Sequence, residues 1–168
     1  MVDLRIKGIL CTLVILLLIL TGCTPKIVGN DGLIAKAREE INIADADTIE
    51  LTIAGESVVE DRHLIWFISG NQYQAHRYVP MEFVSHGNDE YKFVQAYHSV
   101  ERGADIFVHM WGRGYSFLLN NPKCSSIIMT DSLGNSQTVA IDKLPFVYYC
   151  QGFPNEYYFL DKDGKELK

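Results

Sequence analysis

The chain has 168 residues, of which 48% are hydrophobic and 11% aromatic, and its formal net charge is −6. A net-acidic protein repels phosphates, which argues against nucleic acid as a partner and against electrostatic adhesion to anionic lipid. A chain of this length can bury a sizeable core without a metal or a disulfide, so we expect no structural cofactor.

The first twenty residues have the parts of an export signal. Arg5 and Lys7 form a short positive head, and the thirteen residues from Gly8 to Leu20 carry no charge. As a helix this run would span roughly 20 Å, less than the ~30 Å hydrocarbon core of a bilayer. The pattern therefore favours a removable signal over a transmembrane anchor.

The apolar run ends in Leu20-Thr21-Gly22-Cys23, with Pro25 close behind. These four residues resemble the lipobox of bacterial lipoproteins. The resemblance covers only the first 25 or so residues. It implies that the Cys23 sulfur receives a diacylglyceryl group and that the signal, residues 1–22, is removed. The alternative is a buried cysteine at the end of a membrane helix.

Removal of the signal leaves 146 residues, with 13 basic and 20 acidic side chains. We expect residues 23–30 to be the lipidated cysteine and a short tether, and residues 31–168 to be one globular domain. Two or three acyl chains hold a protein stably on a bilayer. The predicted location is therefore the extracytoplasmic side of the cell membrane, with a lipid anchor.

The mature chain begins with an amphipathic pattern over Asp31–Ile43, which predicts a helix with Asp31 as its N-cap. Short alternating segments follow, and residues 99–103 are expected to be a loop and 112–114 a kink within a strand. The expected strands are 48–53, 63–69, 73–84, 91–98, 105–111, 115–119, 126–130, 138–141, 146–150 and 157–160. Strands do not alternate with helices, which argues against a parallel α/β sheet. The predicted class is α+β, with the helix packed on a curved, mostly antiparallel sheet or partial barrel.

Two cysteines, Cys124 and Cys150, remain in the mature chain besides Cys23. An extracytoplasmic location permits a disulfide between them. If the last strands form a simple meander, however, the two residues lie roughly 23 Å apart at ~3.3 Å per residue, beyond the reach of a bridge. Either the thiols are free or the meander is wrong.

The histidines recur at intervals of 10 to 13 residues, at His63, His76, His86, His98 and His109. Convergence of several on one sheet face would make a zinc or copper site, but no metal-binding motif supports this interpretation over ordinary histidines.

A hydrolase is the second functional alternative. Pairs such as His98 with Glu101 or Asp105 with His109 offer a base beside Ser116, but the G-x-S-x-G pattern is missing. The ending, residues 161–166, predicts an Asp-Gly turn rather than a calcium loop.

All 19 aromatic residues follow the predicted signal, and they cluster along the expected strands. Adjacent strand residues point to opposite faces, so some of these rings can form a binding face, with Trp66, Trp111, Tyr149 and Tyr157 as its candidate residues. The alternative is that these aromatic residues pack in the core.

The mature part also resembles small uncharacterised lipoproteins of Gram-positive bacteria, in its aromatic strands and its Asp-Gly ending. This resemblance implies no activity.

The sequence thus predicts a membrane-anchored, non-enzymatic module that binds an envelope protein or glycan. The alternatives are a cell-envelope hydrolase that uses a histidine–carboxylate pair and a metal-handling lipoprotein. No cofactor, bound metal or nucleic-acid partner is expected.

Overall fold

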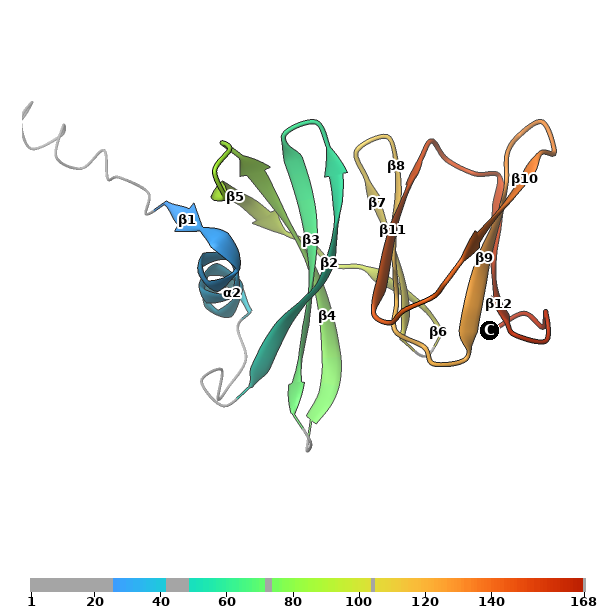
Figure 1. Ribbon diagram of the computed structural model, residues 1–168, viewed down its shortest axis with the longest axis horizontal. Coiled ribbons are helices and arrows are strands. Elements are labelled where there is room, and N and C mark those ends of the chain that lie inside the picture. Colours follow the sequence, from blue (N-terminus) through green and yellow to red (C-terminus); the bar gives the residue numbers. More distant parts are fainter. Residues whose placement is uncertain (1–25, 42–48, 72–73, 104, 168) are drawn as a thin grey trace, which may run out of the picture.

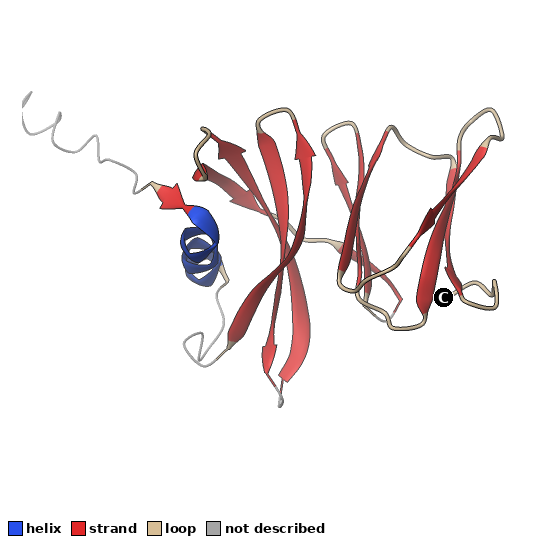
Figure 2. Cartoon of the chain, in the orientation of Figure 1, coloured by secondary structure: helices blue, strands red, loops and turns tan. Residues whose placement is uncertain are grey.

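The computed structural model describes residues 26–41, 49–71, 74–103 and 105–167 (Figure 1). The predicted signal and Cys23 lie outside these residues. The described chain has one α-helix and twelve strands (Figure 2). They are β1 (Ile27–Val28), α2 (Gly29–Glu40), β2 (Glu50–Val59), β3 (Arg62–Asn71), β4 (Gln74–Ser85), β5 (Glu90–Ala96), β6 (Val100–Gly103), β7 (Ile106–Trp111), β8 (Gly114–Leu119), β9 (Cys124–Thr130), β10 (Ser136–Ala140), β11 (Phe146–Gln151) and β12 (Glu156–Asp161).

The strands form three sheets in place of the single sheet that was expected. The N-terminal sheet has the order β1-β5-β4-β3-β2, the central sheet β11-β8-β7-β6 and the distal sheet β10-β9-β12. Every pairing between these strands is antiparallel. The mostly antiparallel arrangement with one short helix is therefore confirmed. The simple meander is wrong, because β11 pairs with β8 and β12 pairs with β9.

The elements are stacked in four layers, with α2 at one end and the distal sheet at the other (Figure 1). A separate hydrophobic cluster fills each of the three spaces between layers. Leu33 and Ala37 of α2 pack with the outer face of the N-terminal sheet. Trp66 and Trp111 belong to the cluster between the N-terminal and central sheets, and Phe117 to the cluster between the central and distal sheets.

Strand β3 shows why this sequence needs layers on both sides of a sheet. Its side chains alternate in direction, as in any strand. Ile65 and Phe67 contact the cluster beneath the helix, whereas Leu64 and Trp66 contact the central sheet. All four are fully or almost fully buried. Consecutive apolar residues are therefore stable here only because both faces of the strand are covered.

Three local predictions need correction. The expected kink is a tight hairpin between β7 and β8, in which Trp111 pairs with Gly114 and Gly112 has a positive φ of 57°. The expected loop at 99–103 contains the edge strand β6, which pairs with β7. Its polar residues are mostly exposed, so its sequence carries no strand-like alternation.

The helix also starts earlier than expected. Its N-cap is Val28, which makes no side-chain cap, and Asp31 lies in the first turn, where a negative charge favours the helix dipole. The predicted tether, residues 23–30, therefore overlaps β1 and the start of α2. In the described part of the chain, no helix combines the length and apolar character required to cross a membrane.

We predict that Phe117→Ala lowers the free energy of unfolding by about 3–5 kcal/mol, because it leaves a large cavity in a packed core. Phe117 is fully buried and lies within 6.1 Å, centroid to centroid, of Tyr115, Tyr157 and Phe159. Chemical denaturation measures the change. The control is Leu133→Ala in an exposed turn (85% exposed), for which we expect a change within about 0.5 kcal/mol. Equal effects from the two substitutions would contradict the described packing.

Candidate functional site

A hydrogen-bonded group of polar side chains lies in the centre of the interface between the N-terminal and central sheets. Trp66 Nε1 donates to Ser116 Oγ over 2.7 Å, and the hydroxyls of Ser57 and Ser116 are 2.8 Å apart. All three side chains are buried. Because Ser116 is enclosed and already engaged in two hydrogen bonds, it cannot meet a substrate as a nucleophile.

Glu82 of β4 is the most deeply buried charge in the described chain, with 1% of its surface exposed. Its carboxylate accepts hydrogen bonds from Tyr97 Oη and from the Arg62 guanidinium. Burial would raise the pKa of Glu82, but these hydrogen bonds outweigh it and keep the pKa below the ordinary value. Arg62 is partly exposed and lies over the Trp111 ring at 5.6 Å, so it closes this end of the interface.

His109 lies on the same buried face, paired across the strands with Ser116. Its ring centroid is 4.6 Å from that of Tyr97 and 6.4 Å from that of Trp66. Nε2 is buried and has no hydrogen-bond partner among the described residues. Burial lowers the pKa of His109, opposed by a hydrogen bond to the His98 backbone and by the charge of Glu82. This histidine is neutral and enclosed, which is unsuitable for a base that must reach a substrate.

The five histidines do not converge. His63 Nδ1 lies 2.7 Å from Glu56 at the edge of the N-terminal sheet, and His86 is exposed in the turn before β5. His98 and Glu101 line a separate hollow of about 590 Å³ beside β5 and β6. The side chain of His76 lies outside the described residues. Among the residues described, no group of three or more His, Cys, Asp or Glu side chains could hold a metal ion.

The four aromatic residues proposed as a binding face are not exposed together. Trp66 and Trp111 are 0% and 3% exposed and pack between two sheets, so their assignment to an exposed binding face is wrong. Tyr149 is half-buried beside Trp111, with ring centroids 5.7 Å apart. Tyr157 is half-buried in the next interface, against Phe117 and Tyr115. These residues are buried because neighbouring sheets cover their strands, and the sequence analysis did not predict those additional layers.

Cys124 and Cys150 are both free thiols. They come from different sheets, β9 and β11, and both contact the cluster between the central and distal sheets. Burial raises the pKa of Cys124 to about 11 and also raises the pKa of Cys150. Both sulfurs are therefore protonated near neutral pH and are poor nucleophiles.

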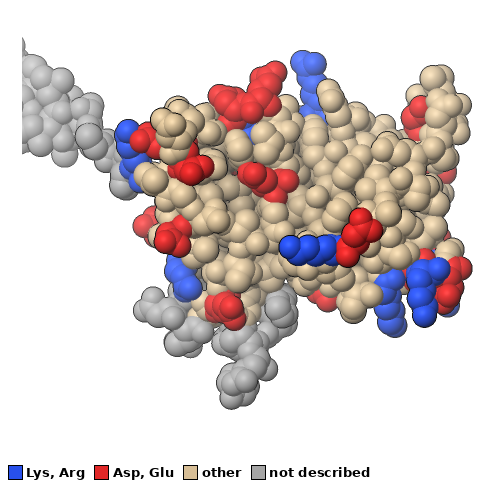
Figure 3. Space-filling model, in the orientation of Figure 1, with Lys and Arg blue, Asp and Glu red and all other residues tan. Residues whose placement is uncertain are grey.

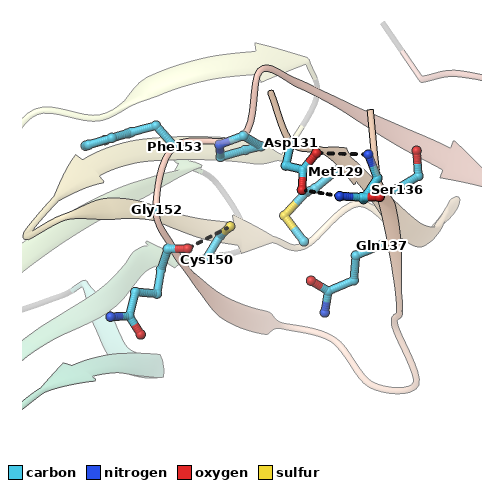
Figure 4. Close-up of a pocket in the computed structure, with 10 residues that line it drawn as sticks. Met129, Asp131, Ser136, Gln137, Cys150, Gly152 and Phe153 are labelled. Carbon is cyan, nitrogen blue, oxygen red and sulfur yellow. Dashed lines mark hydrogen bonds between the residues drawn. The ribbon is translucent and has the colours of Figure 1, made fainter. Parts of the chain in front are cut away.

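A shallow, open hollow lined by both polar and apolar groups lies at the end of the molecule formed by the distal sheet, and we name it the distal pocket (Figure 4). It measures about 330 Å³. The β9–β10 hairpin forms one wall and the loop between β11 and β12 the other. Its lining consists of Met129, Asp131, Asn135, Ser136, Gln137, Cys150, Gln151, Gly152, Phe153 and Pro154. Asp131 is the only charged residue in this lining.

Phe153 is the residue in this pocket that the sequence analysis missed. It is 54% exposed and follows Gly152, which has a positive φ of 89°. A bulky side chain is disfavoured at that φ, so glycine allows the chain to turn and present the next residue. An aromatic residue between Gly152 and Pro154, outside any strand, was the available signal.

We predict that acid destabilises the protein through His109. Because its pKa is lowered in the folded state, the unfolded chain binds a proton first, and the free energy of unfolding falls as the pH drops through about 6.5. Denaturation of wild type and of His109→Gln at pH 7.5 and 5.5 measures this loss, which should be largely absent in the variant. At these pH values Glu82, with its lowered pKa, stays ionised. The control is exposed His86→Gln, which should retain the loss; an unchanged loss in His109→Gln would contradict the assignment.

Known proteins provide no template for these features. No protein-family model, curated protein or solved structure matches the chain.

Proposed function

We propose that this protein is a lipid-anchored, non-enzymatic binding protein on the extracytoplasmic side of the cell membrane. The observation that carries the proposal is Leu20-Thr21-Gly22-Cys23 at the end of an uncharged run, behind a basic head. A thiol at that point can take a diacylglyceryl group, and two acyl chains suffice for stable attachment.

The start of the folded chain supports close attachment. Lys26 Nζ contacts both carboxylate oxygens of Glu90, at 2.9 and 3.1 Å, and β1 then pairs with β5. Four residue steps separate Cys23 from Ile27, which at about 3.5 Å per residue allow at most roughly 14 Å. A lipid on Cys23 would therefore keep the end of the molecule that carries β1 and α2 beside the bilayer.

The buried position of the candidate catalytic residues favours a binding function over a catalytic one. Ser116, His109 and Glu82, the best set of nucleophile, base and carboxylate, are enclosed between two sheets. His98 and Glu101 share a solvent-exposed hollow, but no hydrogen bond or ion pair between them is found in the described chain. On the face seen in Figure 3, charged side chains are scattered and large areas carry none. Such a surface suits a neutral or mixed partner more than a highly charged polymer.

We predict that Cys23→Ala abolishes lipid attachment, because alanine offers no sulfur for the thioether. Cells that express the full chain are fed an alkyne-tagged palmitate, and the label on the purified protein is measured together with its N-terminal mass. The control is Cys150→Ala, which removes another thiol of the mature chain and should be labelled like wild type. Labelling of Cys23→Ala at the wild-type level, or a wild-type mass that retains residues 1–22, would refute the anchor.

A further inference from the structure

Phe153 forms a fixed aromatic platform at one side of the distal pocket. Its ring is supported edge-to-face by Tyr115, with centroids 5.2 Å apart and an interplanar angle of 83°. The loop that carries it is held at both ends. Gly152 N donates to Arg113 O over 2.7 Å, and Asn155 N donates to Thr130 O over 2.8 Å. A ring held in this way binds a ligand with little further loss of entropy.

Gln137 supplies hydrogen-bonding capacity across the pocket. It lies on the same face of β10 as Val139, which packs against the core beside the central sheet. Figure 4 shows Gln137 and Phe153 on different sides of the pocket, with Met129 and Cys150 between them and with the Phe153 side chain extending outward from its loop, away from Gln137. In the described chain the Gln137 amide has no hydrogen-bond partner, so its donors and acceptor remain available to a ligand.

The remaining surface of the pocket is neutral. Met129 and Cys150 provide two polarisable sulfur groups, and the thiol is protonated. The Asp131 carboxylate is occupied by its own turn. Its Oδ1 accepts from the backbone N–H groups of Leu133 and Asn135, and its Oδ2 accepts from the Asn135 amide. The pocket therefore offers a ring, an amide and an apolar floor, without a free charge.

We propose that the distal pocket binds an N-acetylated amino sugar of an envelope glycan. The C–H face of a pyranose ring packs on the Phe153 ring. The acetamido group bonds to the Gln137 amide, and its methyl group contacts Met129 and Cys150. The volume of about 330 Å³ is at the small end of the ~300–1,000 Å³ range of ligand pockets, which suits a sugar unit more than a folded or extended chain.

The position of the pocket agrees with this ligand. The distal sheet and the N-terminal β1 lie at opposite ends of the longest axis of the molecule (Figure 1). The inference rests on the proposed function for the place where it acts, since a lipid on Cys23 would direct the pocket away from the bilayer. The ligand is therefore expected in the surrounding envelope and not among lipid headgroups.

The test uses the full-length protein, purified in detergent, and two β-1,4-linked tetrasaccharides, one of N-acetylglucosamine and one of glucose. Calorimetry and saturation-transfer NMR measure binding. We expect the N-acetylated tetramer to bind at least tenfold more tightly than the glucose tetramer. Phe153→Ala should weaken this binding at least tenfold, and Gln137→Ala should remove most of the preference for the acetamido group.

The matched control is Leu133→Ala, which changes an exposed residue of the same β9–β10 hairpin that does not line the pocket. It should bind like wild type, and a melting curve of each variant shows that it is folded. Absence of binding at millimolar tetramer, equal binding of the two tetramers, or unchanged binding by folded Phe153→Ala would each overturn the proposal. Lipid labelling at Cys23 is measured separately, so the anchor can fail or hold independently of the sugar.

Discussion

Burial of both faces of the two inner sheets is the constraint on which the rest of the structure depends. A strand enclosed between two layers has no face on which a polar group can meet water, so each such group needs a protein partner. Ser57, Trp66 and Ser116 satisfy one another, and the Glu82 carboxylate accepts hydrogen bonds from Arg62 and Tyr97. His109 Nε2 and Trp111 Nε1 are the exceptions, since neither has a partner among the described residues. The result is a rigid interior whose polar residues support the fold and do not contact ligands.

Most individual strands could be predicted, because alternation and turn residues are local signals. The sheet to which each strand belongs could not, since pairing depends on residues far apart in the chain. The run Leu64–Ile68 nevertheless held a usable signal. Five consecutive apolar residues without alternation are typical of a strand covered on both faces. Interpreted in that way, the run places Trp66 in the core and excludes it from a binding face.

The candidate site was harder to predict for a related reason. Large aromatic residues on strands were predicted to form a binding face. Here, however, another layer covers the strands that carry Trp66 and Trp111. Loops have no such cover and more often carry binding residues. Phe153 lies in a loop, and Gln137 comes from a separate hairpin. Only the return of β11 to the central sheet and of β12 to the distal sheet brings the two together, and no local pattern encodes that return.

The two ends of the molecule therefore have different roles in the proposed arrangement. At the near end, β1 leaves so few residues before Cys23 that an anchored domain has little freedom to move away from the bilayer. At the far end, a shallow pocket for one sugar unit would bind weakly, because few groups contribute. Weak sites become effective when many copies on one surface meet a repeating polymer, since each further contact is then intramolecular.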